Sequence, residues 1–228
     1  MSFSPSRPRI CLFCKEPRPG FSKTRLAGEL GPEVAAEAAW AFLSDGLEVA
    51  RRVAEALEGR LLAVHTPAEP GERFLRLLEE AGAESLPQVA GDLGARMAAA
   101  LAGSEGPRLA LGSDSPDLPP APLIEAMARL RPGSAWTAPA ADGGYVALAL
   151  GQGVESAPLR ARIAWSSASA REDTERALAE AGVEVLAPAP GWSDVDDAAD
   201  LRALQERLRR APASVARATR AWLACRRP

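Results

Sequence analysis

The chain has 228 residues, of which 47% are hydrophobic and 25% charged, with a formal net charge of −3. This composition excludes a disordered chain and is long enough to bury a full core, so we expect one globular domain over residues 1–228. The small negative net charge excludes a general nucleic-acid-binding surface, and any anion site must therefore be local.

Apolar runs typical of β-strands alternate along the chain with Ala- and Leu-rich runs typical of helices. We expect strands at residues 10–14, 60–65, 108–112, 135–139, 144–150 and 183–187. We expect helices at residues 32–57, 70–81, 93–102, 120–130, 169–181, 198–209 and 212–225. This alternation predicts an α/β fold in which helices cover both faces of a mostly parallel sheet. Ligands of such sheets bind in the loops that follow the strands.

The first strand is followed by a basic turn, "KEPRPGFSKTR". Lys15, Arg18, Lys23 and Arg25 surround Gly20 in this turn. Backbone N–H groups and several cations in one loop are typical of a phosphate site, although a solvated basic loop is the alternative. The turn is not a P-loop, because Pro17 and Ser22 stand where that motif requires glycine.

A second polar loop, "GSDSPDLP", follows the strand at 108–112. It carries Ser113, Asp114 and Asp117, which we take as substrate-side residues. Carboxylates at a strand end suit Mg²⁺ or Mn²⁺ together with substrate phosphates. For Asp114 this interpretation is favoured, whereas Asp117 could instead cap the next helix.

Three further segments carry polar or glycine residues of interest. "ADGGY" places Asp142, Gly143 and Gly144 in a tight turn before a strand. "SDVDDAADL" places Asp194, Asp196 and Asp197 before a helix, where capping would require only one of them. "QVAGDLGARM" contains Gln88, Gly91 and Leu93 near a helix start, where a nucleoside could be admitted.

The cysteines and the single histidine are expected to be structural. Cys11 and Cys14 have the Cys-x-x-Cys spacing, but residues three apart on a strand point to opposite faces. His65 ends an apolar run. Three cysteines fit a reducing compartment, and neither a membrane span nor a signal-type segment is evident, so a cytoplasmic location without membrane contact is expected.

Six motifs together carry a resemblance: "FCKEPRPGFSKTRLA", "GDLGARM", "GSDSPDLP", "ADGGYVAL", "IAWSS" and "WSDVDDAADL". Their order and spacing resemble an uncharacterised transferase family, often labelled glycosyltransferase, within the nucleotide-diphospho-sugar transferase superfamily. That superfamily includes molybdenum-cofactor and phospholactate guanylyltransferases. The resemblance runs from Ile10 to about Leu204. It implies a three-layer Rossmann-like fold of the GT-A type with a mostly parallel mixed sheet.

The resemblance also implies roles for the residues in these motifs. Lys23 and Arg25 would hold nucleotide phosphates, with Lys15 nearby. Asp114 would bind the metal, with Asp194 or Asp196 as the second carboxylate. Asp142, Gly143 and Gly144 would line the acceptor or sugar side, and Gln88, Gly91 and Leu93 the nucleoside side.

Nucleotidyl transfer is the favoured activity, with a nucleoside triphosphate and a small phosphorylated acceptor as substrates. An ionised acceptor phosphate needs no protein base, which suits a chain without a convincing catalytic histidine. The alternative is a glycosyltransferase that uses a nucleotide sugar, with Asp142 as its base. A non-catalytic nucleotide-binding module is disfavoured by the acidic residues at the metal-side positions. The helix at 212–225 packs either on its own domain or on a second copy in a homodimer.

Overall fold

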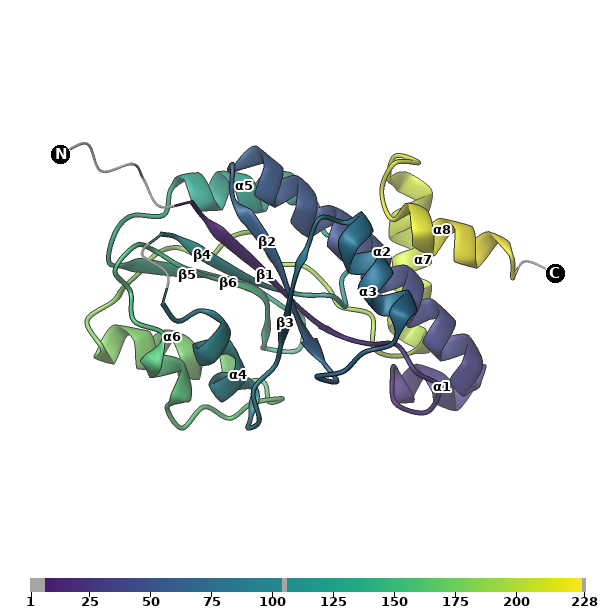
Figure 1. The fold of residues 1–228 in the computed structure, drawn as a ribbon, viewed down its shortest axis with the longest axis horizontal. Coiled ribbons are helices and arrows are strands. Elements are labelled where there is room, and N and C mark those ends of the chain that lie inside the picture. Colours follow the sequence, from purple (N-terminus) through teal and green to yellow (C-terminus); the bar gives the residue numbers. More distant parts are fainter. Residues whose placement is uncertain (1–6, 104–105, 227–228) are drawn as a thin grey trace.

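A seven-stranded sheet forms the centre of the computed structural model, which describes residues 7–103 and 106–226 (Figure 1). Its strand order is β3-β2-β1-β4-β6-β5-β7. The strands are β1 (Arg9–Lys15), β2 (Arg60–Thr66), β3 (Glu84–Pro87), β4 (Arg108–Gly112), β5 (Ser134–Pro139), β6 (Tyr145–Leu150) and β7 (Glu184–Val185). β6 runs antiparallel to its neighbours β4 and β5, whereas the other pairs are parallel. The expected mostly parallel mixed sheet is confirmed.

Helices lie on both faces of the sheet, as Figure 1 shows. Those longer than one turn are α1 (Thr24–Leu30), α2 (Pro32–Ala56), α3 (Glu72–Glu80), α4 (Leu93–Ala100), α5 (Pro120–Ala128), α6 (Ala170–Glu180), α7 (Ala198–Arg210) and α8 (Arg217–Ala224). α2, α3 and α5 bury apolar side chains against one face, and α4 and α6 against the other. The three-layer α/β fold is therefore confirmed. Within the described ranges, no helix is both long and apolar enough to cross a membrane.

Alternation along β1 explains how its two cysteines are buried. Ile10, Leu12 and Cys14 join the cluster beneath α2, while Cys11 joins the cluster on the opposite face. Burial raises the pKa of both thiols to about 12, so neither is a reactive thiolate near neutral pH. All three cysteines of the chain are free.

His65 at the end of β2 is buried, as its apolar run predicts. Its two ring nitrogens are engaged by the carbonyl oxygen of Pro67 at 2.9 Å and the hydroxyl of Ser85 at 2.8 Å. Its ring also meets Phe74 edge to face. These contacts give the histidine a structural role, tying β2 to its neighbouring strand and to α3.

A third cluster joins α1, α2, α7 and α8 at one end of the molecule. α8 packs on α2, where the buried carboxylate of Asp45 accepts hydrogen bonds from the backbone N–H groups of Ala218 and Thr219 and from the Thr219 hydroxyl. Trp222 meets Phe42 edge to face, with ring centroids 6.2 Å apart. The C-terminal helix thus packs on its own chain. It starts at Arg217 rather than at Pro212, because Ala216 adopts a left-handed conformation just before it.

Besides the later start of α8, the differences from the sequence expectations include α1, β3 and β7. α1 was not expected, since its seven residues lie between a basic turn and Gly31. β3 was missed because its sequence, ESLP, has no apolar run and lies at the sheet edge. β7 is shorter than expected, because only Glu184 and Val185 pair with β5.

Candidate active site

The basic turn between β1 and α1 is cross-linked by its own side chains. Lys15 donates from Nζ to the carbonyl oxygen of Phe21 at 2.6 Å, and the Ser22 hydroxyl accepts from the backbone N–H of Arg18. Arg18 turns back onto Glu16, whose other carboxylate oxygen accepts from Gly71 N–H. Arg18 is therefore paired within the turn. Lys23 and Arg25 are the cations of this turn that face other loops.

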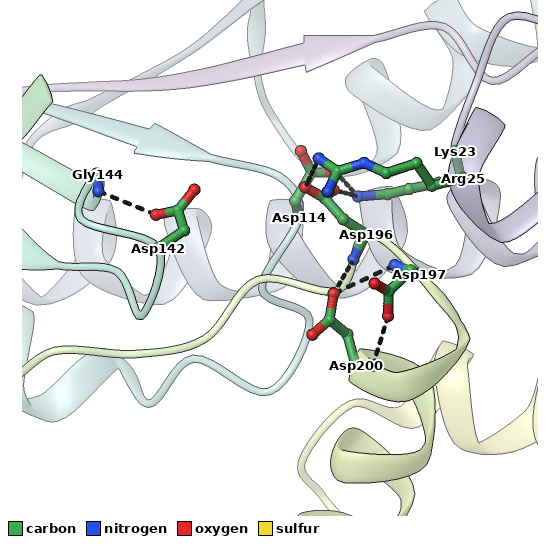
Figure 2. A network of polar contacts seen from close by, with 8 residues as sticks. All are labelled: Lys23, Arg25, Asp114, Asp142, Gly144, Asp196, Asp197 and Asp200. Carbon is green, nitrogen blue, oxygen red and sulfur yellow. Dashed lines mark hydrogen bonds and ion pairs between the residues drawn. The ribbon is translucent and has the colours of Figure 1, made fainter. Parts of the chain in front are cut away.

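Lys23 lies between two carboxylates that come from distant parts of the chain (Figure 2). Its Nζ is 2.5 Å from Asp114 Oδ1 and 3.0 Å from Asp196 Oδ1. Only 7% of its side chain is exposed. Burial by itself would lower the pKa of Lys23, but the charges of Asp114 and Asp196 outweigh burial and raise it. The ammonium group therefore stays charged at neutral pH.

Arg25 approaches the same acidic residue from the solvent side. Its Nη2 is 3.0 Å from Asp196 Oδ2, and 72% of its side chain is exposed. Asp196 consequently receives one cation on each carboxylate oxygen. Because the guanidinium is exposed, this contact can be exchanged for a ligand at small cost.

The loop before α7 brings Asp196 to the end of β4. The backbone N–H of Val195 donates to the carbonyl oxygen of Asp114 at 2.9 Å, which ties this loop to the strand end. Asp197 is the N-cap of α7 and forms a capping box with Asp200. The expectation that one of these aspartates caps the helix is correct, and Asp196 is left for the site.

In Figure 2 the turn that carries Asp142 lies on the side of Asp114 opposite to Lys23 and Arg25. Asp142 Oδ1 accepts from the backbone N–H of Gly144 at 2.9 Å. Burial, and then the negative charges of Asp196, Asp142 and Asp114, raise the pKa of Asp194. Asp142 and Asp194 are therefore electrostatic neighbours of the Asp114–Lys23–Asp196 group.

A pocket of ≈ 400 Å³ opens at the carboxyl ends of β1, β2 and β4. The predicted residues that line it are Lys15, Lys23, Arg25, Gln88, Leu93, Ser113, Asp114 and Asp196. Those outside its lining are Gly20, Gly91, Asp117, Asp142, Gly143, Gly144 and Asp194. A wider hollow of ≈ 940 Å³ lies between α2, α3 and α8 and is lined by none of the predicted site residues.

The predicted nucleoside end of the pocket contains a cation that was not selected from the sequence. Arg96 on α4 donates from Nε to the carbonyl oxygen of Gly91 and from Nη1 to Gln88 Oε1. Gln88 donates in turn to the carbonyl oxygens of Val64 and Cys14, so its amide is held in place. Arg96 stands within the quoted motif "GDLGARM", and an arginine one turn into a helix at a strand end was a signal available from sequence.

The Asp117 carboxylate, which was predicted to bind substrate, is held by contacts within the chain and lies outside the pocket lining. Only 3% of its side chain is exposed, and both carboxylate oxygens are occupied by Arg207, at 2.6 and 3.0 Å. Trp192 Nε1 donates to it as well, at 3.1 Å. It does not cap α5 either, because the N-cap residue is Pro119. Asp117 instead fixes α7 and the segment before it to the β4 end.

Replacing Asp117 with asparagine is expected to destabilise the fold by about 2 kcal/mol, because Arg207 loses its countercharge. Breaking a fully buried pair costs about 3–5 kcal/mol, but the Arg207 side chain is 29% exposed and water compensates in part. The thermal midpoint should fall by about 4–8 °C. Glu206→Gln, which breaks an exposed ion pair with Arg209, is the control and should change stability by less than about 0.5 kcal/mol. Equal midpoints for the two variants would contradict the assignment.

The three predicted metal ligands do not form a ready-made metal centre. In residues 7–103 and 106–226, no three His, Cys, Asp or Glu side chains are grouped so that they could hold an ion. Asp114 and Asp196 do converge, on the Lys23 ammonium. A pair of carboxylates that already holds one positive charge is a suitable partial donor set for Mg²⁺, which takes its other ligands from water and phosphates.

Comparison with known proteins places this sequence in a family. Residues 49–167, more than half of the chain, match the family described as "Uncharacterized protein conserved in bacteria (DUF2064)". The chain belongs to the DUF2064 family. The matched segment contains Asp114 and Asp142, whereas Lys23 and Asp196 lie outside it. No curated protein matches this DUF2064 member.

Solved structures share the fold over nearly the whole DUF2064 chain. A protein from Desulfovibrio desulfuricans G20, assigned as a nucleotide-diphospho-sugar transferase, is 26% identical with a TM-score of 0.79, covering 96% of this chain and 94% of that one. A nucleotidyl transferase from Methanothermobacter thermautotrophicus (Mth528) is 17% identical, with a TM-score of 0.52 and coverages of 90% and 98%. For 4-diphosphocytidyl-2C-methyl-D-erythritol synthase the values are 14%, 0.53, 90% and 100%. The resemblance to this superfamily is thereby confirmed for the fold.

Proposed function

We propose that this protein is a metal-dependent nucleotidyltransferase, which joins the nucleoside monophosphate of a triphosphate to a small phosphorylated acceptor and releases pyrophosphate. The observation that carries the proposal is the pocket at the carboxyl ends of the strands, where cations and carboxylates face each other. Lys23 and Arg25 supply positive charge, and Asp114 and Asp196 supply oxygen ligands. A nucleotide bound with a divalent cation matches both halves of this arrangement.

The phosphate end of the nucleotide is proposed to lie against the basic turn. Arg25 is mostly exposed, and its guanidinium can move from Asp196 to a phosphate oxygen as a charge-assisted hydrogen bond. Lys15 lines the same pocket and has its ammonium at the carbonyl oxygen of Phe21. Together with Lys23, these cations would neutralise the pyrophosphate as it leaves.

Asp114 and Asp196 would hold the metal, which supplies charge neutralisation to the phosphates when it is bound. Asp142 and Asp194 lie outside the pocket lining but add negative charge near these two carboxylates. A divalent cation would offset that charge where phosphates approach Asp114 and Asp196. This arrangement supports a metal-dependent reaction.

The proposed chemistry needs positioning more than proton transfer. An oxygen of the acceptor phosphate attacks the α-phosphorus, a new P–O bond forms, and the bond to the bridging oxygen of the β-phosphate breaks. That oxygen leaves with the pyrophosphate and carries the electron pair. A phosphate monoester is largely ionised at pH 7, since its second pKa is about 6, so no side chain has to remove a proton. The buried, fully engaged His65 is consistent with this.

The structural relatives support the proposal at the level of the fold. A nucleotidyl transferase and 4-diphosphocytidyl-2C-methyl-D-erythritol synthase share the architecture with TM-scores of 0.52 and 0.53. Their identities of 17% and 14% do not extend the argument to substrates. The choice of nucleotidyl transfer therefore rests on the arrangement of charges in the pocket.

Glycosyl transfer from a nucleotide sugar is the second candidate. Asp142 favours it, because its carboxylate lies in a tight turn beyond the pocket lining and is oriented by Gly144 N–H, as a base facing an acceptor hydroxyl would be. The Desulfovibrio protein assigned as a nucleotide-diphospho-sugar transferase, with 26% identity, is compatible with this candidate. In this reaction a nucleoside diphosphate would leave, or a monophosphate if the donor carries only one phosphate.

The two candidates are separated by the product that is released. The purified protein is incubated with Mg²⁺, each nucleoside triphosphate, and a mixed pool of small phosphorylated metabolites and phosphonates. Acceptor-dependent pyrophosphate is expected, and it should disappear in the Asp114→Asn variant. If nucleotide sugars raise the thermal midpoint and no triphosphate does, nucleotidyl transfer is rejected and Asp142 becomes the first residue to test.

A further inference from the structure

The Lys23 ammonium lies where a metal ion held by two carboxylates would be expected to lie. This ammonium contacts carboxylate oxygens of two acidic residues, Asp114 after β4 and Asp196 before α7. These two residues are far apart in the sequence. The contact distances are 2.5 and 3.0 Å, and the lysine side chain is almost entirely buried. Figure 2 shows the ammonium lying against both carboxylates. The chain itself thus supplies a positive charge to its acidic pair.

The backbone holds this lysine in place at a conformational cost. Lys23 has φ 49° and ψ 50°, a left-handed conformation that is rare for a residue with a side chain. It precedes α1, whose Leu26 is fully buried in the cluster between α1, α2 and α7. Such strain persists where the surrounding structure fixes the backbone, and it is found preferentially at functional sites. The direction of the Lys23 side chain is therefore set by the fold.

The same oxygens are those a divalent cation needs. Mg²⁺ and Mn²⁺ take six oxygen ligands, commonly one or two carboxylates together with phosphates and water. Asp114 Oδ1 and Asp196 Oδ1 are both engaged by Lys23, and within the described ranges no larger group of ligating side chains is present. The protein without nucleotide thus offers a divalent cation few free ligands and a nearby positive charge that repels it.

We propose that the Lys23 ammonium fills the cation position between Asp114 and Asp196 in the nucleotide-free protein, so that a divalent cation enters only together with the nucleotide. The phosphates of the incoming nucleotide draw Lys23 away from the carboxylates and contribute the missing oxygen ligands. This inference rests on the proposed nucleotide site but not on which bond is transferred. It applies equally to a triphosphate and to a nucleotide sugar.

The test measures Mn²⁺ binding in the absence of nucleotide. Binding is monitored by the decrease in the electron paramagnetic resonance signal of free Mn²⁺. Lys23→Met removes the charge and keeps a long apolar side chain. It should bind Mn²⁺ at least about tenfold more tightly than the parent, because two carboxylates lose a cation within hydrogen-bonding distance. Lys15→Met is the matched control. It removes one charge from the same pocket without releasing a carboxylate, so its Mn²⁺ affinity should stay close to that of the parent.

Equal Mn²⁺ affinities for Lys23→Met and the parent would overturn the proposal, as would an equal gain in Lys15→Met. If Lys23→Met unfolds too readily for titration, Lys23→Gln is measured by its thermal midpoint. Mn²⁺ should then raise the midpoint of the glutamine variant more than that of the parent, and an equal rise counts against the proposal. None of these measurements uses turnover, so a failure of nucleotidyl transfer in the pyrophosphate assay leaves their outcome readable.

Discussion

Replacing Asp114 with asparagine is expected to lower turnover about a hundredfold, which corresponds to roughly 3 kcal/mol of lost transition-state stabilisation. Asparagine keeps the size of the side chain but removes the charge that faces Lys23 and would hold the metal. Folding should change by less than about 1 kcal/mol, because 51% of the Asp114 side chain is exposed and Lys23 retains its contact with Asp196. Steady-state rates with Mg²⁺ and thermal unfolding measure the two effects separately.

Asp92→Asn is the matched control for this prediction. It makes the same chemical change at the N-cap of α4, where Asp92 accepts from the backbone N–H of Ala95. Asparagine caps helices about as well as aspartate, so stability should hold. An Asp114→Asn enzyme that turns over at the parent rate would show that this carboxylate does not serve the reaction. A loss of the same size in Asp92→Asn would show that turnover depends on the total negative charge of this region rather than on Asp114 in particular.

The parts of the site that lie at strand ends could be predicted from the sequence. The run "LALG" indicated a buried strand, and β4 does end at Gly112, so that Asp114 follows it directly. The basic turn was located in the same way, because β1 ends at Lys15. In a parallel sheet the carboxyl ends of neighbouring strands meet at one edge, and β1 and β4 are indeed neighbours.

The pairings between distant segments could not be predicted in this way. Lys23 and Asp196 are 173 positions apart in the sequence. Their contact depends on the hydrogen bond that the backbone N–H of Val195 donates to the carbonyl oxygen of Asp114. The ion pair of Asp117 could not be predicted for the same reason, since its partner Arg207 lies on a helix 90 positions away. A sequence pattern shows which side chains carry charge, but it does not show which of them neutralise each other.

The remaining differences between the expected and observed helices depend on how clear the local sequence pattern of each helix is. α2 was predicted over its full length, with one residue too many at its end, because its 25 residues repeat apolar positions at helical spacing. α1 contains Gly28 and spans only seven residues, which is too short for periodicity to be evident. Its existence depends instead on tertiary packing of Leu26, a contact that no local pattern reports.

Gly143→Ala is expected to destabilise the protein by about 3 kcal/mol or more, lowering the thermal midpoint by about 6–12 °C, and to abolish productive placement of Asp142. Gly143 has φ +90°, and a Cβ atom there would lie 2.2 Å from the carbonyl oxygen of Ala168 and 2.5 Å from its Cα. Backbone atoms cannot yield as a flexible side chain can. The turn must therefore move away from the start of α6, where Gly143 accepts a hydrogen bond from Arg171 N–H.

Gly182→Ala separates the steric part of this effect from the conformational part. Gly182 has φ +81°, close to that of Gly143, but a Cβ atom there meets nothing within 4 Å. Its substitution should cost only the left-handed conformation, about 1–2 kcal/mol. The difference between the two variants therefore measures the close approach of the Asp142 turn to the segment before α6. If both variants lose the same stability, the close approach contributes nothing, and the position of Asp142 must be fixed by the hydrogen bond from Gly144 N–H rather than by packing against Ala168.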